Sequence, residues 1–216
     1  MVDIFEEVSE DLRRDRSLTL WRKYGSYVIG LAVLVVVGVA GYQGWTGYRQ
    51  QQREAAAIRY AGALDLARAG RPAEAADAFK VIAAEGVGEG YGVLARFQEA
   101  NQRLQAGDVA GGLAILDAVA ADAGVEAVFR DLATLTAASQ RIAGRGDPAA
   151  LRDRLEALDR PDNPWRFSAI ELRALLALNG GDDRRGRELL KRLVDDAATP
   201  QAMRARAAEL LAVIGS

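Results

Sequence analysis

A repeat that begins after about position 60 leaves this chain few possible folds. Glycines recur at separations of 37, 39 and 35 residues (107 − 70, 146 − 107 and 181 − 146), at Gly70, Gly107, Gly146 and Gly181. Seven residues before each glycine stands a small side chain: Ala63, Ala100, Ser139 and Ala174. Nine residues after it stands a large apolar one: Phe79, Leu116, Leu155 and Leu190. Twelve residues after it stands an aliphatic one: Ile82, Val119, Leu158 and Leu193. A period of this size predicts stacked copies of one supersecondary unit.

Each unit is predicted to be a helical hairpin. A glycine that follows a helix tolerates the left-handed backbone conformation that ends it. Offsets of nine and twelve place two apolar residues on one face of the next helix, and the small residue allows close helix approach. Asn163-Pro164 and Thr199-Pro200 are predicted as helix N-caps. The expected helices are residues 50–69, 73–85, 91–106, 109–122, 125–143, 148–159, 165–179, 183–196 and 200–214, the last capping the stack.

A long uncharged stretch precedes the repeats. Residues 24–48 are 25 consecutive positions without a charge, enough for a helix of about 37 Å, against a hydrocarbon core of about 30 Å. Arg22 and Lys23 precede the stretch, Arg49 follows it, and aromatic residues stand at both ends. A cleaved signal peptide would start earlier and after a basic segment, whereas this N-terminus is acidic. The stretch therefore predicts a retained transmembrane signal anchor, and the helix of residues 50–69 can continue it without a break.

Basic residues at the two ends of this stretch predict its orientation. Five lie in the 11 residues up to position 23 and three in the 11 from position 49 onward. We therefore expect a cytoplasmic tail (1–23), a transmembrane anchor (24–48) and a periplasmic repeat domain (49–216) in a bacterial inner membrane.

Composition excludes several classes of function. The chain has no cysteine and no histidine, which removes disulfides, the usual zinc sites and histidine-based catalytic triads. The net charge of −2 lacks the basic surplus of a nucleic-acid-binding protein. Most acidic residues lie among arginines at helical spacing, as expected of a solvated face. We predict no enzyme activity, no catalytic or metal-binding residues, no cofactor and no small-molecule substrate.

The repeats resemble tetratricopeptide repeats, best in the segment AGALDLARAGRPAEAADAFKVIA. Unit three departs from that pattern, with Leu151 at a position where a small residue is expected. With the acidic tail, the segment LWRKYGSYVIG and the single span, the chain is similar to the YfgM-like ancillary subunits of the SecYEG translocon. The resemblance implies an all-α fold: an N-terminal transmembrane helix and a tetratricopeptide-like α-solenoid of about four hairpins plus a C-terminal capping helix. It also implies a scaffold that binds Sec translocon subunits, periplasmic chaperones or exported chains.

In the repeats that the chain resembles, the first helix of each hairpin lines a peptide-binding groove. Transferred to this sequence, that role falls on six residues: Tyr60, Arg68, Phe97, Asn101, Gln105 and Gln140. Their aromatic, amide and guanidinium groups suit peptide recognition. The alternative for the two aromatic rings is packing between repeats.

Small residues within the predicted span form a second candidate site: Gly38, Ala40, Gly41 and Gly44. They would present a smooth face to another membrane helix, and ordinary tolerance of glycine in lipid is the alternative.

For the whole chain, two other functions remain open. One is a coordinator of cell-envelope growth or division built on the same repeats, and the other is an envelope hydrolase.

Overall fold

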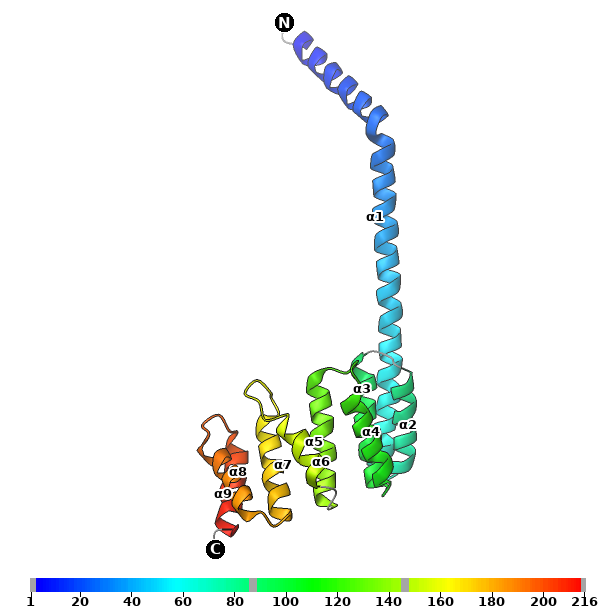
Figure 1. Cartoon of the computed structure of the whole chain (residues 1–216). Helices are drawn as coiled ribbons and strands as arrows, with labels where there is room; N and C mark the ends of the chain where they lie inside the picture. Colours follow the sequence, from blue (N-terminus) through cyan, green and yellow to red (C-terminus); the bar gives the residue numbers. More distant parts are fainter. Residues whose placement is uncertain (1–2, 86–88, 145–147, 215–216) are drawn as a thin grey trace. The chain divides into compact units, whose positions relative to one another are not determined.

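The structure is a computed structural model, which describes the backbone of residues 3–85, 89–144 and 148–214 and the side chains of those residues except 3–29, 32–33, 53, 89–90 and 148–150. The described residues form helices joined by short turns (Figure 1). In chain order the helices are α1 Asp3–Arg68, α2 Pro72–Ala84, α3 Glu89–Gln105, α4 Val109–Ala121, α5 Ala127–Ala143, α6 Pro148–Glu156, α7 Arg166–Asn179, α8 Asp183–Asp195 and α9 Gln201–Ile214. The prediction of an all-α repeat fold is confirmed, and the helix bounds agree to within a few residues.

The chain divides into two compact units, Met1–Glu54 and Ala55–Ser216. In the first unit, the described side chains from Leu34 to Gln50 are exposed, and Arg49 lies over the ring of Trp45 at 5.1 Å from the ring centroid. Within the part of the chain that the structure describes, no helix has the length and apolar character needed to cross a membrane. The predicted span, residues 24–48, includes side chains outside the described set, and it stays a prediction.

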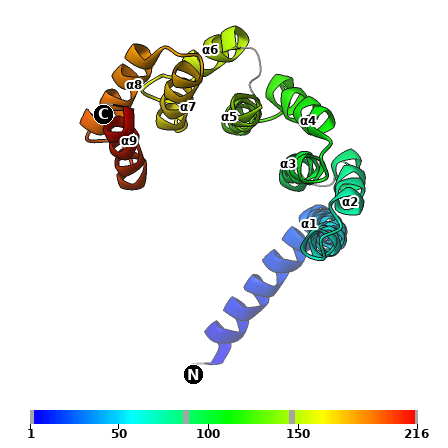
Figure 2. The ribbon, with the colours of Figure 1, turned by 90° about the horizontal axis from the view of Figure 1, so that it is seen from below.

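The second unit consists of consecutive helical hairpins: the end of α1 with α2, α3 with α4, α5 with α6, and α7 with α8. The last described helix, α9, packs on α8. In Figure 2, α3, α5 and α7 lie along one side of the row, and α2, α4, α6 and α8 lie along the other. The first hairpin begins without a break in α1, as the sequence predicted.

Three of the repeated glycines end the first helices of their hairpins in the left-handed conformation. Their φ angles are 72° at Gly70, 87° at Gly107 and 78° at Gly181. Each glycine N–H donates to the carbonyl three residues earlier, and the following N–H donates to the carbonyl five residues earlier, over 2.9 to 3.1 Å. This double hydrogen bond is the Schellman motif, which satisfies the last carbonyls of a helix. The fourth glycine, Gly146, lies outside the described residues.

The repeated apolar positions form the core. Nine residues after the glycines, Phe79, Leu116, Leu155 and Leu190 are all fully buried, and the aliphatic residues three positions further on are buried as well. These side chains belong to four separate clusters, one for each hairpin and the helix that follows it. The core prediction is therefore confirmed in every unit.

One small-residue position departs from the prediction. Ala63, Ala100 and Ala174 are buried at the crossings of their hairpins, but Ser139 is exposed. Its neighbour Ala138, which is 1% exposed, takes the buried place on α5. The prediction for Ser139 is wrong because the buried small residue of the third hairpin lies eight residues before the repeated glycine, whereas it lies seven residues before it in the other hairpins.

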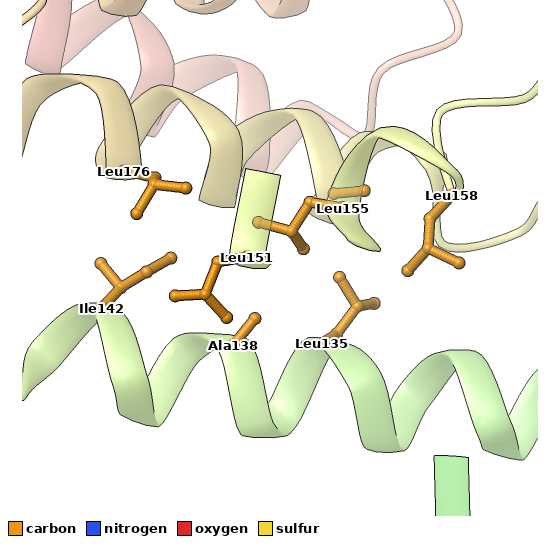
Figure 3. Close-up of a cluster of buried hydrophobic side chains, with 8 residues drawn as sticks. Leu135, Ala138, Ile142, Leu151, Leu155, Leu158 and Leu176 are labelled. Carbon is orange, nitrogen blue, oxygen red and sulfur yellow. The ribbon is translucent and has the colours of Figure 1, made fainter. Parts of the chain in front are cut away.

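In the third hairpin, Leu151 stands at a position where the other hairpins have a small residue. Five residues after the other repeated glycines stand small buried residues, Ala75, Gly112 and Gly186, where the two helices come closest. Leu151 is buried at the corresponding place on α6, among Ala138, Ile142 and Leu176 (Figure 3). A leucine is too large for the close approach of two backbones that the small residues allow. Like the other second helices, α6 packs on its partner, α5, and on the helix that follows, α7.

Neither predicted proline-associated cap lies at the N-cap of a helix. The N-cap of α7 is Trp165, and Asn163 lies in the turn before it, where its side-chain oxygen accepts a hydrogen bond of 2.8 Å from the N–H of Trp165. The hydroxyl of Thr199 has no hydrogen-bond partner among the described residues, so its predicted role as a cap is wrong. Two caps that the sequence analysis missed are Asp108 and Asp182, which accept hydrogen bonds from the backbone N–H groups of Gly111 (2.9 Å) and Arg185 (3.0 Å).

Candidate functional site

The two predicted groove aromatics lie within the packed part of the repeats. The half-buried ring of Tyr60 packs against Phe79 and Tyr91, with centroid separations of 5.2 and 5.7 Å. Burial raises the pKa of the Tyr60 hydroxyl, and a hydrogen bond with Gln98 partly offsets this effect. Phe97 is half-buried against the core that joins α3, α4 and α5. Both rings therefore pack between repeats.

Arg68 lies at the end of α1 and is exposed. Its guanidinium contacts the carboxylate of Asp65 in the preceding turn at 3.1 Å. Both side chains are more than 70% exposed, and an ion pair of this kind contributes little to stability. Arg68 therefore remains accessible to a partner at one end of the row of hairpins.

The three predicted amides are exposed. Asn101 and Gln105 lie one turn apart on α3, and Gln140 lies near the end of α5. None of the three side chains makes a hydrogen bond to another described residue, so their amide donors and acceptors face solvent. An amide offers both a carbonyl acceptor and an NH₂ donor, the same groups that a peptide backbone carries. Together with Arg68, these residues are the part of the predicted site that the structure leaves exposed.

The charged residues of the first helices are in a different situation, because they bond within the chain. Arg96 on α3 contacts Asp122 after α4 at 2.7 Å, and Arg166 on α7 contacts Asp196 after α8 at 2.7 Å. Arg59 on α1 forms the corresponding pair with Glu85 after α2. The sequence analysis missed these pairs. Their signal was an acidic residue 15 positions after three of the four repeated glycines, at 85, 122 and 196.

A buried ion-pair network joins the third and fourth hairpins. Asp159 follows α6 and is 9% exposed at its side chain, and its carboxylate contacts Arg173 on α7 at 2.8 Å. Arg192 on α8 contacts the same carboxylate at 2.6 and 2.8 Å. Arg173, 7% exposed, also reaches Glu156 at 3.4 Å. A buried charge needs such partners, so this network restricts how α6, α7 and α8 can pack.

Asp117 on α4 forms a smaller network with Arg141 on α5 and Arg154 on α6. Burial by itself would raise the pKa of Asp117. Hydrogen bonds from the two guanidinium groups outweigh this effect, and the pKa is lowered. The ionised carboxylate therefore joins three helices, α4, α5 and α6.

Two cavities flank α6. One, of about 360 Å³, lies among α4, α5 and α6 and includes Asp117, Thr134 and Arg154 in its lining. The other, of about 210 Å³, lies among α6, α7 and α8 and includes Arg152, Arg173 and Leu189. The charged groups of Asp117, Arg154 and Arg173 are bonded within the chain. In the described portions, no cluster of three or more acidic side chains is arranged to hold a metal ion.

The second candidate site lies in the first unit. Gly38, Ala40, Gly41 and Gly44 are exposed on α1, and a Cβ atom added at any of the three glycines would meet no other atom within 4 Å. This part of the helix therefore presents a smooth surface. No described residue covers it.

Comparison with known proteins identifies the family. No curated protein and no solved structure matches the chain. The family profile described as tetratricopeptide repeat-like domain matches residues 19–158, from within α1 to the end of the third hairpin. This range covers more than half of the 216 residues. Domains of this type are generally non-catalytic modules that bind other proteins. The chain, with its four stacked hairpins and repeated glycine turns, belongs to the tetratricopeptide repeat-like domain family.

Proposed function

We propose that this protein is a membrane-anchored, non-catalytic scaffold of a bacterial inner membrane. Residues 24–48 would span the membrane with residues 1–23 in the cytoplasm, and the repeat domain would lie in the periplasm. There the repeats would bind Sec translocon subunits, periplasmic chaperones or exported polypeptides. This proposal joins the family assignment to the resemblance of the whole chain to YfgM-like translocon subunits.

One observation carries the proposal. Helix α1 runs from Asp3 to Arg68 as a single element that contains the uncharged stretch and also supplies the first helix of the first hairpin. A protein-binding domain that starts on the same helix as an anchor is held close to its membrane partners. Tethering of this kind raises the effective concentration of the partners without any additional contact.

The orientation can be tested with fusions at the C-terminus. Alkaline phosphatase fused after residue 216 should be active, because the enzyme folds only after export. A green fluorescent protein fusion at the same position should be dark when exported through the Sec system. The reverse pattern would place the repeats in the cytoplasm and refute the proposed topology.

The partners can be tested by photocrosslinking in cells. A photoreactive amino acid at Gln51, exposed in α1 just after the predicted span, should crosslink to translocon subunits identified by mass spectrometry. The same amino acid at Lys191, exposed on α8, is the control for nonspecific capture. Capture of only cell-wall synthesis or division proteins would replace the translocon role with that of an envelope coordinator. Hydrolysis of wall fragments or casein by the purified chain would contradict a non-catalytic role.

A further inference from the structure

One of the two cavities that flank α6 brings three arginines together. Its volume is about 210 Å³, and it lies between α6 and α8, which are neighbouring second helices on the same side of the row in Figure 2. Residues of α7 complete its lining. The charged groups around it are Arg152 and Glu156 on α6, Arg173 on α7, and Asp182 and Arg185 at the start of α8. Guanidinium groups that converge in this way are suited to bind an anion.

This cavity is separate from the groove predicted for the first helices. Asn101, the middle one of the groove residues predicted on α3, corresponds to Leu175 on α7, because each stands six residues before a repeated glycine. Arg173 and Ala177 line the cavity. At about 100° per residue, each of them lies about 160° around α7 from Leu175. The cavity is therefore on the opposite side of α7 from the predicted groove.

Arg173 is buried but only partly paired. Its side chain is 7% exposed, and its Nη1 atom donates a hydrogen bond of 2.8 Å to Asp159. Its Nη2 atom contacts the carboxylate of Glu156 at 3.4 Å. This separation is longer than the roughly 2.7–2.9 Å of a charge-assisted hydrogen bond. Because a buried guanidinium is stabilised by each acceptor that it reaches, the Nη2 side of Arg173 can gain from a carboxylate placed closer to it.

Glu156 marks the place that an anion can take. It is the last residue of α6, its side chain is 63% exposed, and its ion pair with Arg173 is the long contact described above. Ion pairs of exposed side chains contribute little to stability, so this carboxylate can turn into solvent at small cost. A carboxylate from outside the chain can then approach Arg173 closely.

Two further arginines lie at the rim of the cavity. Arg152 is exposed and has no hydrogen bond or ion pair with another described residue. Arg185 pairs with Glu188 at 3.2 Å, and both side chains are about half exposed, so this pair is weak. Asp182, the other carboxylate in the lining, accepts a 3.0 Å hydrogen bond from the backbone N–H of Arg185 as the N-cap of α8. With Glu156 turned away, three guanidinium groups face one carboxylate.

The larger cavity on the other side of α6 lacks this surplus of positive charge. Of its charged lining residues, Asp117 and Asp131 are acidic, and only Arg154 is basic. Arg154 is paired with Asp117 at 2.9 Å. The two cavities lie between successive second helices but differ in charge, and the surplus of cations belongs to the cavity between α6 and α8.

We propose that the cavity between α6 and α8 binds the carboxylate of an acidic side chain from a protein partner, in place of Glu156. Arg152, Arg173 and Arg185 would hold this carboxylate. Glu156 and the two arginines of the rim are exposed, so a side chain can enter while its backbone stays outside. A guanidinium and a carboxylate form two parallel charge-assisted hydrogen bonds, which a neutral amide cannot match. The inference rests on the proposed scaffold function and adds a second binding surface to it, on the side of the second helices.

Binding can be measured with two synthetic peptides of about 12 residues with blocked ends and a neutral fluorophore. One peptide has glutamates among serines and glycines, and the other has glutamines in their place. The full chain, in nanodiscs of zwitterionic lipid, should bind the glutamate peptide at least about tenfold more tightly by fluorescence anisotropy at ~50 mM NaCl. Raising NaCl to ~500 mM should weaken this binding at least about threefold, because salt screens exposed charges. Equal affinities for the two peptides, or no binding of either, would overturn the proposal.

Two matched double variants locate the site. R152Q/R185Q removes two positive charges from the rim and should weaken binding of the glutamate peptide at least about tenfold. R184Q/K191Q removes two positive charges of α8 that lie about 100° or more around the helix from Arg185, and its Kd should stay within about twofold of the parent. All four positions are exposed, and circular dichroism melting checks that both variants fold. Equal losses in the two variants would assign the binding to the overall charge of α8 and not to the cavity.

Glu156→Gln should have the opposite effect. It keeps the shape of the side chain and removes the carboxylate that competes for Arg173. The glutamate peptide should therefore bind this variant at least about threefold more tightly than the parent chain. If the contact between Glu156 and Arg173 only supported the fold, the substitution would give no gain in affinity. An unchanged or weaker affinity would contradict the displacement of Glu156.

Competition shows which anion the cavity prefers. Glutarate should release the labelled peptide at a lower concentration than inorganic phosphate does. Stronger competition by phosphate would assign the cavity to a phosphate group and overturn the proposal. Crosslinking at Gln51 tests the scaffold function independently of these peptides, so the failure of one proposal can be told from the failure of the other.

Discussion

Thr199 occupies the position in the turn between α8 and α9 that Val125 occupies between α4 and α5. Both N–H groups donate to the carbonyl of an aspartate three residues earlier, at 3.1 Å from Thr199 and 3.0 Å from Val125. Both carbonyls accept a 3.0 Å hydrogen bond from an arginine five residues later, Arg204 and Arg130 respectively. Both residues are buried, but only Thr199 carries a hydroxyl, and this hydroxyl has no partner among the described residues.

Thr199→Val should stabilise the repeat domain by about 1 kcal/mol, because it removes a buried polar group that is not hydrogen-bonded. Valine has nearly the shape of threonine and already fills the equivalent place in the second hairpin. Urea unfolding followed by circular dichroism measures the change. The reverse substitution Val125→Thr should destabilise by a similar amount. A loss of stability in Thr199→Val would show that the hydroxyl is satisfied in solution.

Gly112 and Gly186 occupy equivalent positions in two hairpins, but their replacement by alanine should have different effects on stability. A Cβ at Gly112 would lie 2.9 Å from the backbone carbonyl oxygen of Ala100, which cannot move without displacing α3. At Gly186 the nearest carbonyl oxygen, that of Ala174, is 3.5 Å away, and the added Cβ would instead meet the side chain of Leu178, at its Cδ2 and, over 2.6 Å, its Cγ.

We expect Gly112→Ala to cost about 1–3 kcal/mol in the free energy of unfolding. Gly186→Ala should stay within about 1 kcal/mol of the parent, because the higher helix propensity of alanine offsets the shift of the leucine side chain. Parallel urea titrations of the two variants provide the comparison. Equal losses would argue against a closer helix crossing in the second hairpin.

Leu151→Ala should destabilise the domain, although it restores the small residue that the repeat pattern contains at this position. Leu151 is 3% exposed and fills the space among α5, α6 and α7 (Figure 3). Removing most of its side chain should leave a cavity and cost about 2–5 kcal/mol. Thermal unfolding measures the loss, with Leu94→Ala, an exposed leucine on α3, as the control. A gain in stability of the Leu151→Ala variant would mean that α5 and α6 can move closer together and remove the cavity.

Acid should destabilise the repeats. A hydrogen bond from Arg96 lowers the pKa of Asp122, and one from the N–H of Gly111 lowers that of Asp108. Asp117, described above, is also lowered. An unfolded aspartate titrates near about 3.9. With lower values in the folded state, the stabilisation is complete above about pH 4 and is lost as the pH falls further.

Urea midpoints measured from neutral pH down to about pH 2.5 should therefore fall below about pH 4. In Asp122→Asn, which keeps an acceptor for the N–H of Gly124 but no charge for Arg96, the decline should be shallower. Lys80→Gln on the exposed face of α2 should leave the profile unchanged. A midpoint that holds constant down to about pH 2.5 would contradict the lowered pKa values of these aspartates.

Much of the fold follows from spacing alone. The glycine period placed the helix ends, and the residues nine and twelve positions later supplied the core in all four units, because burial on one helix face depends on local periodicity. Asn101, Gln105 and Gln140 came from the resemblance to tetratricopeptide repeats, and the structure leaves all three exposed. The exposure of Ser139 did not follow from the spacing, because α5 ends three residues before Gly146, whereas the other first helices end two residues before their glycines.

The row of helical hairpins and the long helix that precedes it follow from the sequence, since both are encoded in residues close together in the chain. Which side chains stay exposed depends on the tertiary structure. The half-buried rings of Tyr60 and Phe97 pack against neighbouring helices, and arginines such as Arg96 pair with carboxylates 26 residues away. These outcomes depend on contacts between helices distant in sequence, and no local pattern specifies them.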